Sequence, residues 1–158
     1  MTIVPDKAVA TMDRIAREVE RDSLYRGIIT AQRYEPQPTS ADAISSAARS
    51  ISETLKLSAI VCYTGSGSTG MRMSRERPDT PVIALTPIPA TARRLALVWG
   101  LHCVLTDDAR DLDDMVNRAA RIAYDEGFAE PGQRIIVTAG LPLGTPGATN
   151  MLRIAYVG

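Results

Sequence analysis

The sequence has few aromatic residues and no excess of charge of either sign. Aromatics make up 4% of it, so the core must be built mainly from Val, Ile, Leu, Ala and Met. Eighteen Lys and Arg balance eighteen Asp and Glu, which leaves a formal net charge of zero. A chain without net charge has no field that attracts nucleic acid or acidic membranes. We therefore expect neither nucleic acid nor a membrane as a partner.

Long apolar runs are missing too. No stretch approaches the roughly 18 apolar residues of a membrane span, and the start of the chain lacks the basic and then apolar pattern of a signal peptide. The two cysteines, Cys62 and Cys103, lie in apolar runs, so we expect buried thiols rather than a disulfide or a metal pair. These features predict a cytoplasmic globular domain.

Two regions of different character divide the 158 residues. Apolar residues at helical spacing predict an amphipathic helix over residues 5–20, and the polar stretch 22–39 with its two prolines predicts a linker. A lone amphipathic helix has nothing of its own to cover, so it either docks on the following domain or belongs to an absent one. We assign residues 1–38 to this helix and linker, and residues 39–158 to a compact α/β domain.

The larger region alternates predicted helices with predicted strands. Apolar runs rich in β-branched residues predict strands at 59–63, 81–86, 102–105, 134–138 and 150–157. Helices are expected at 39–56, after the glycine-rich turn up to Pro78, at 91–99 and at 112–126. This alternation is typical of a parallel sheet covered by helices on both faces.

The last connection differs from the others. Only residues 139–149 join the fourth and fifth strands, which leaves no room for a crossover helix, so the fifth strand should run antiparallel to the fourth. The sequence therefore predicts a three-layer α/β/α sandwich around a mixed five-stranded sheet, with four parallel strands and a last antiparallel one.

Two glycine-rich loops are the best candidates for a binding site. The first, Thr64-Gly65-Ser66-Gly67-Ser68-Thr69, lies between a strand and a helix, where N–H groups, hydroxyls and a helix N-terminus can converge on a phosphate. It contains neither Lys nor Arg and lacks the ending of a nucleoside-triphosphate loop. The second, residues 140–150, faces the first if the first and fourth strands are neighbours. An ordinary turn and a rigid connection are the alternatives for these two loops.

Other polar clusters indicate structure rather than catalysis. Spaced arginines can clamp phosphate, but more often they cover a helix face or pair with carboxylates; they are Arg72, Arg75, Arg77, Arg93 and Arg94. His102 and Cys103 are adjacent in a strand and point to opposite faces, which makes a poor nucleophile–base pair. An acidic run over residues 107–114 suits a helix N-terminus better than a metal. We expect no catalytic residue and no metal site.

Four segments in register resemble the C-terminal α/β domain of pyruvate kinases. They are the loop 64–69 with the following Arg77-Pro78, the strand 81–86 with Thr91-Ala92-Arg93-Arg94-Leu95, Gly127-Phe128 with the strand 135–137, and Gly147-Ala148-Thr149-Asn150-Met151-Leu152-Arg153. Their order and spacing hold over residues 40–158. The predicted first helix resembles the last helix of that family's catalytic barrel.

The resemblance implies a regulatory and oligomerisation domain of an enzyme that makes pyruvate and ATP from phosphoenolpyruvate and ADP in glycolysis. That family's active site, with its magnesium and potassium, lies in a barrel and a lid domain that are absent here, so the chain is expected to be inactive alone and to hold no cofactor. The implied partners are the rest of a pyruvate kinase, further copies in a homo-oligomer, and a sugar-phosphate or nucleotide-monophosphate effector. The effector phosphate is implied to contact Thr64, Ser66, Gly67, Ser68, Thr69 and Gly147.

Two departures from the family pattern weaken the expectation of fructose 1,6-bisphosphate. Members activated by the bisphosphate often place Lys or Arg within the loop, where this chain has Gly65 and Ser68. Some hold the second phosphate with an arginine near the position of Met115. A monophosphate effector, a purely structural domain without an effector, and a free-standing phosphate-binding module all remain open.

Overall fold

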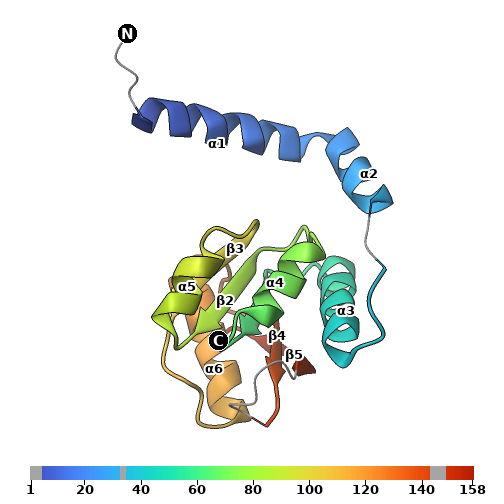
Figure 1. Ribbon diagram of the computed structural model, residues 1–158. Coiled ribbons are helices and arrows are strands. Elements are labelled where there is room, and N and C mark those ends of the chain that lie inside the picture. The colour runs from blue at the N-terminus through green and yellow to red at the C-terminus, as the bar shows by residue number, and fades with distance from the viewer. Residues whose placement is uncertain (1–4, 33–34, 143–148) are drawn as a thin grey trace. The chain divides into compact units, whose positions relative to one another are not determined.

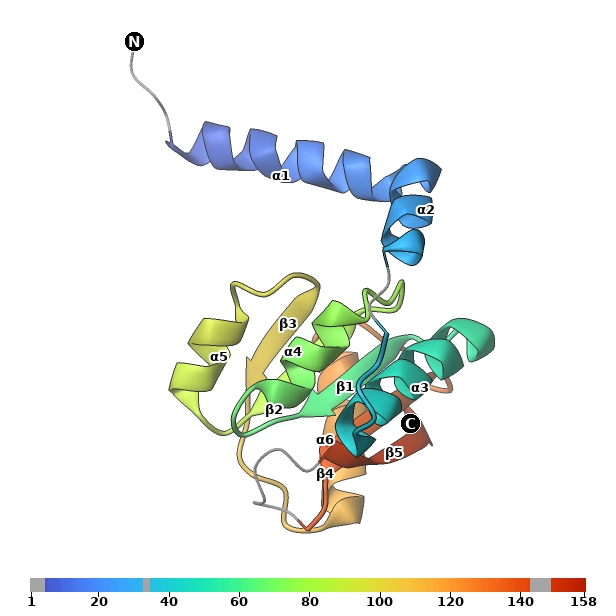
Figure 2. The ribbon, with the colours of Figure 1, turned by 45° about the vertical axis from the view of Figure 1, so that its right-hand side comes forward.

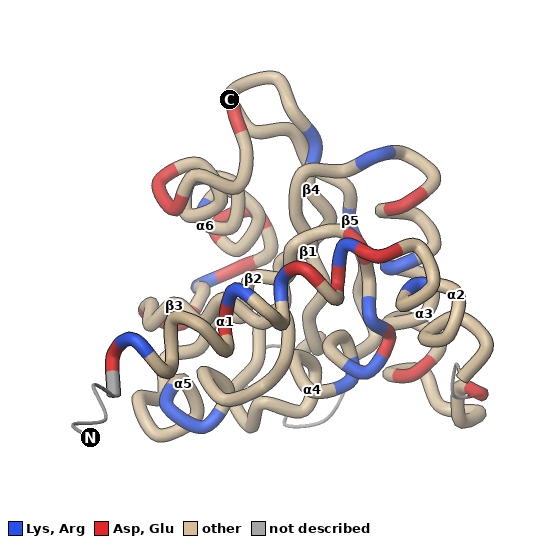
Figure 3. Tube along the Cα trace, turned by 90° about the horizontal axis from the view of Figure 1, so that it is seen from above, with Lys and Arg blue, Asp and Glu red and all other residues tan. Residues whose placement is uncertain are grey.

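A computed structural model describes residues 5–32, 35–142 and 149–158. The chain divides into two compact units, residues 1–35 and 36–158. Among the described residues, no helix combines the length and the apolar character that a membrane crossing needs. Acidic and basic residues are interspersed along much of the chain (Figure 3), apart from the acidic run over residues 107–114.

The described residues of the first unit form two helices, α1 (Pro5–Arg21) and α2 (Ser23–Ala31). The first confirms the helix predicted over residues 5–20. The expected linker, however, is helical over much of its length, because the Asp22 carboxylate accepts the N–H of Leu24 at 2.8 Å and so caps α2. The two prolines that indicated a linker lie beyond the end of this helix.

The second unit contains a five-stranded sheet in the order β3-β2-β1-β4-β5 (Figure 1). The strands are β1 (Ala59–Tyr63), β2 (Val82–Thr86), β3 (Leu101–Leu105), β4 (Arg134–Gly140) and β5 (Thr149–Tyr156). The pairs β1–β2, β2–β3 and β1–β4 are parallel, whereas β4 and β5 are antiparallel. This confirms the mixed sheet predicted from the short last connection.

Helices cover both faces of the sheet, which confirms the three layers (Figure 2). They are α3 (Ser40–Leu55), α4 (Ser68–Arg75), α5 (Pro89–Leu95) and α6 (Leu112–Asp125). Alternate residues of β1 point to opposite sides: Val61 packs in the cluster that includes α6, and Ile60 in the cluster that includes α3 and α4. Both side chains are fully buried, and each contributes about 1.5–3 kcal/mol of hydrophobic stabilisation.

The bounds of α5 differ from the prediction of 91–99. The helix begins two residues earlier because Pro89 occupies its first turn, where a missing N–H costs nothing. It ends at Leu95, and the following residues form a turn that contacts α4. The Ser74 hydroxyl donates to the Trp99 carbonyl at 2.6 Å, and the Arg77 guanidinium lies 4.1 Å from the centre of the Trp99 ring.

Candidate functional site

The glycine-rich loop lies at the point where the chain order of the sheet reverses. Strands β1 and β4 are neighbours and parallel, so the segments that follow them leave the same edge of the sheet. The hydroxyls of Thr69, in α4, and Thr149, at the start of β5, lie 2.8 Å apart and are buried. This contact confirms that the first loop and the end of the second connection meet. Gly147 falls outside the described residues.

The loop is closed by its own hydrogen bonds. Gly67 is the N-cap of α4 and has a positive φ of 89°, a conformation that suits glycine. Its N–H donates to the Thr64 hydroxyl at 2.9 Å. The Ser66 hydroxyl donates to that of Ser68 at 3.1 Å and accepts the Ser68 N–H at 3.4 Å. Three hydrogen bonds therefore link residues of the loop to one another.

The predicted phosphate residues separate into two groups. Thr64, Gly67 and Thr69 are buried, and both threonine hydroxyls are engaged within the protein. Ser66 is exposed and Ser68 is half-buried, so these two present hydroxyls at the surface. The structure thus brings Ser66 and Ser68 together as expected, but the hydroxyl of Thr69 points inward to Thr149.

A neighbouring helix supplies a cation that the sequence reasoning did not place at the loop. The Arg94 guanidinium, in α5, donates through Nη2 to the carbonyl of Ser66. The Thr91 hydroxyl, one turn earlier, donates to the carbonyl of Gly65 at 2.9 Å. The available signal was the spacing of these two residues on one helix face, directly after the strand beside β1.

The arginines of α4 are engaged away from the loop. Arg72 Nε lies 3.1 Å from one carboxylate oxygen of Asp42, and Arg75 Nη2 lies 2.6 Å from the other. Arg77 lies over Trp99, as described above. Pairing with a carboxylate, the simpler of the two interpretations, therefore holds for Arg72 and Arg75.

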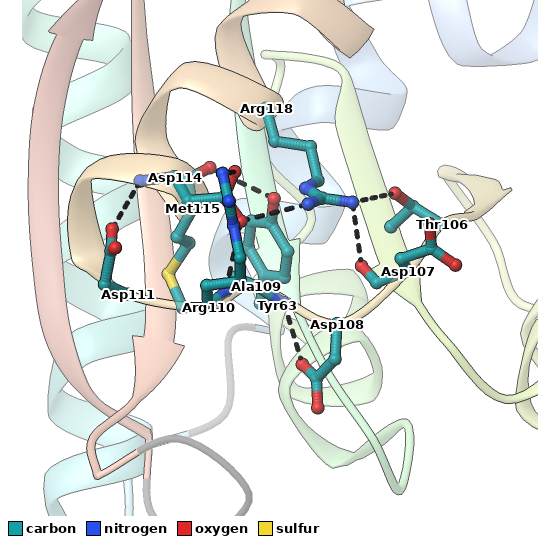
Figure 4. A network of polar contacts seen from close by, with 10 residues as sticks. All are labelled: Tyr63, Thr106, Asp107, Asp108, Ala109, Arg110, Asp111, Asp114, Met115 and Arg118. Carbon is teal, nitrogen blue, oxygen red and sulfur yellow. Dashed lines mark hydrogen bonds and ion pairs between the residues drawn. The ribbon is translucent and has the colours of Figure 1, made fainter.

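The acidic run forms the start of α6, as expected (Figure 4). Asp111 caps the helix by accepting the N–H of Asp114 at 2.8 Å. Hydrogen bonds from the backbone and side chain of Arg110, and one from Arg118, lower the pKa of Asp114 to about 2. Arg118 also reaches the carbonyl of Asp107 at 3.3 Å. The carboxylates of this run therefore accept hydrogen bonds at the N-terminus of α6 and stabilise the start of the helix.

Met115 occupies the interior rather than a ligand-facing surface. It is 1% exposed, and its carbonyl accepts the hydroxyl of Tyr63 at 3.0 Å. Burial raises the pKa of that tyrosine. The position that resembles a second-phosphate arginine in the family therefore faces the core under α6.

The cysteines and the histidine offer no reactive pair in the described structure. Cys62 and Cys103 are both free thiols. Burial raises the pKa of Cys62 to about 12, so it stays protonated. His102 Nε2 lies 2.7 Å from a carboxylate oxygen of Glu126. Within residues 5–32, 35–142 and 149–158, no group of three or more His, Cys, Asp or Glu is arranged to hold a metal ion.

Comparisons with known proteins agree with this fold. Residues 42–155 match the family model "Pyruvate kinase, alpha/beta domain". Relatives named pyruvate kinase include those of Methylorubrum extorquens, 56% identical over 97% of this chain, Agrobacterium vitis, 38% over 98%, and Clostridium acetobutylicum, 34% over 97%. The chain spans 32% of the length of each of these three relatives. The chain therefore belongs to the pyruvate kinase family, and residues 42–155 correspond to the family's alpha/beta domain.

Proposed function

We propose that this chain is the C-terminal regulatory and oligomerisation domain of a pyruvate kinase and binds the phosphate of an effector on its glycine-rich loop. The parent reaction would convert phosphoenolpyruvate and ADP into pyruvate and ATP. The magnesium and potassium of that reaction would be held by parts of the enzyme outside this chain. Further copies of the chain would meet in a homo-oligomer.

The observation that supports the effector site is the loop at the start of α4. The first N–H groups of a helix have no acceptor within the helix, and the helix dipole adds partial positive charge at the same end. The exposed Ser66 and half-buried Ser68 add hydroxyls beside these groups. The loop also lies at the β1–β4 switch point, where open α/β sheets bind ligands.

The charges around the loop favour a ligand with one phosphate. Arg94 brings a permanent positive charge to the carbonyl of Ser66. The candidate position for a second phosphate, Met115, is buried and apolar. A sugar monophosphate or a nucleoside monophosphate therefore suits the loop better than a bisphosphate does.

Calorimetric titration of the purified chain tests this proposal. We expect sugar and nucleoside monophosphates to bind with micromolar to millimolar affinity, because a few hydrogen bonds of about 1.5–3 kcal/mol each must offset the entropy of association. The matching unphosphorylated sugars and nucleosides should give no heat. The chain should also form no pyruvate from phosphoenolpyruvate and ADP, since phosphoryl transfer needs positioned metal and charge.

Ser66→Asp should abolish this binding, because the new carboxylate would occupy the place of the phosphate. Ser50→Asp is the matched control, since Ser50 is exposed on α3 and gains the same charge away from the loop. Retained binding in Ser66→Asp would exclude the loop as the phosphate site. No heat with any phosphorylated ligand would favour a purely structural domain.

A further inference from the structure

Helix α5 holds the glycine-rich loop by two of its carbonyl groups. Thr91 Oγ1 donates to the carbonyl of Gly65 at 2.9 Å, and Arg94 Nη2 donates to the carbonyl of Ser66. The partners are 26 and 28 residues apart in the sequence. Side chains of one helix thus bind two consecutive peptide groups of the loop.

The packing between α5 and the loop is close. A Cβ atom at Gly67 would lie 3.1 Å from Nη2 of Arg94, 3.3 Å from Leu95 and 3.4 Å from Thr91. Leu95 is fully buried and Thr91 nearly so. Gly67 therefore allows α5 to approach the loop, in addition to providing the positive φ that the turn requires.

Each of these two peptide groups is fixed in direction by α5. A trans peptide is planar, so its C=O and N–H point in opposite directions. The peptide between Ser66 and Gly67 is held at both ends, by Arg94 on its carbonyl and by Thr64 on its N–H. The peptide between Gly65 and Ser66 is held by Thr91 on its carbonyl. Its N–H, that of Ser66, therefore points away from Thr91.

We infer that Thr91 and Arg94 are positioning residues, which fix the peptide groups of the glycine-rich loop so that the N–H of Ser66 and the hydroxyls of Ser66 and Ser68 can meet an anion. Binding the two carbonyl oxygens also reduces their repulsion of a negatively charged ligand. The effect on ligand binding rests on the proposed function, whereas the effect on loop order does not. The ligand class is a phosphate monoester, and inorganic phosphate is its simplest probe.

Amide hydrogen exchange of the full chain tests the positioning without any ligand. Thr91→Val keeps the shape of the side chain but removes the donor, and it should speed exchange at Ser66 and Gly67 about two- to tenfold, the effect of one lost hydrogen bond. Thr91→Ser keeps the hydroxyl and should restore the parent rates. Unchanged exchange in both Thr91→Val and Arg94→Gln would overturn the inference.

Phosphate titration, followed by the amide chemical shifts of the loop, tests the consequence for binding. Arg94→Gln and Thr91→Val should each weaken phosphate binding several-fold, whereas Thr91→Ser should bind like the parent. Arg93→Gln is the matched control, because Arg93 is exposed on the same helix and loses the same charge. If Arg93→Gln and Arg94→Gln weaken phosphate binding equally, the effect comes from the loss of one positive charge anywhere on the helix, and the positioning role of Arg94 is contradicted.

Hydrogen exchange and phosphate titration together distinguish the positioning role from the proposed function. If the parent binds no phosphate while Thr91→Val still speeds exchange at Ser66 and Gly67, the proposed function fails and the positioning role stands. If the parent binds phosphate and all four variants match it in exchange and affinity, the positioning role fails and the proposed function stands. Because Arg94 is exposed, Arg94→Gln keeps the test decisive even if Thr91→Val disturbs folding.

Discussion

A single buried carboxylate joins three parts of the second unit. Asp42, in the first turn of α3, accepts the N–H of Gln37 at 3.0 Å and pairs with Arg72 and Arg75 of α4. Burial alone raises the pKa of this carboxyl, but the Gln37 N–H and the two guanidinium groups outweigh it, so the pKa lies below its usual value. Asp42 is therefore ionised in the folded protein and fixes α4, which carries the loop.

Asp42→Asn should lower the free energy of unfolding by about 3 kcal/mol, the lower end for breaking a buried ion pair, because both arginines are partly exposed. The difference in free energy of unfolding between the parent and Asp42→Asn should have its full size above the unfolded-state pKa of Asp, about 3.9. It should disappear as the pH falls through the lower folded-state pKa of Asp42. Urea unfolding at several pH values measures both effects. Asp125→Asn, on the exposed end of α6, is the control, and equal losses in the two variants would contradict this role.

Among single residues, the sequence predicted that the glycine-rich loop lies between a strand and a helix, but it did not predict which side chains surround the loop. The alternation of glycine with Ser and Thr sufficed to identify residues 64–69, because local backbone freedom and hydroxyl donors are properties of the residues themselves. The place of Arg94 depends on how α5 packs against the loop 28 residues earlier. The spacing of Thr91 and Arg94 placed them on one helix face, but tertiary packing decides which face of α5 meets the loop, so the cation beside the loop appeared only in the structure.

Among the elements, strands were easier to predict than short helices. The bounds of β1 agree with the prediction, because a run of five apolar residues lies between polar ones. The direction of β5 followed from the length of one connection. The short helix α2 was missed because Gly27 and polar residues weaken its apolar pattern, and its cap, Asp22, also suits a turn.

The N-cap of α6 gives a prediction at the level of this element. Asp111→Ala should lower the free energy of unfolding by about 1 kcal/mol, because the N–H of Asp114 loses its acceptor at the helix start. Asp111→Asn should remain close to the parent, since Asn is an equally good cap. Thermal unfolding at neutral pH compares the three proteins. Equal stability of the Ala and Asn variants would mean that the cap contributes nothing.

Across the whole molecule, the two units differ in how they bury apolar surface. The second unit encloses two hydrophobic clusters, one on each face of its sheet. In the first unit, every side chain from residue 6 to 32 is exposed or half-buried. The apolar face of α1 leaves more than half of each large side chain exposed; these are Val9, Met12, Ile15 and Val19. Such a face needs a cover, on its own chain, on another copy or on the rest of a pyruvate kinase.

Removing the first unit should therefore leave a folded domain with a changed solubility or oligomeric state. Deletion of residues 1–38 removes the exposed face of α1, so light scattering after gel filtration should report fewer associated species than the parent at equal concentration. Met12→Gln combined with Ile15→Gln keeps the helix but makes its face polar, and should shift the oligomeric state in the same direction. Loss of the circular dichroism of the folded state would instead show that the first unit is integral to the fold.

The residue at which the deletion ends makes this last test more specific. Deletion of residues 1–38 also removes the N–H of Gln37, one of the donors to Asp42, whereas deletion of residues 1–35 keeps it. The longer deletion should therefore be less stable to urea than the shorter one, by about 1–3 kcal/mol for a bond to a buried charge. When both deletions also carry Asp42→Asn, the difference in their stability to urea should be smaller, because a neutral amide gains much less from the Gln37 N–H than a carboxylate does. Equal stability of the two deletions would place the boundary of the domain after residue 38 and show that the Gln37 bond is dispensable.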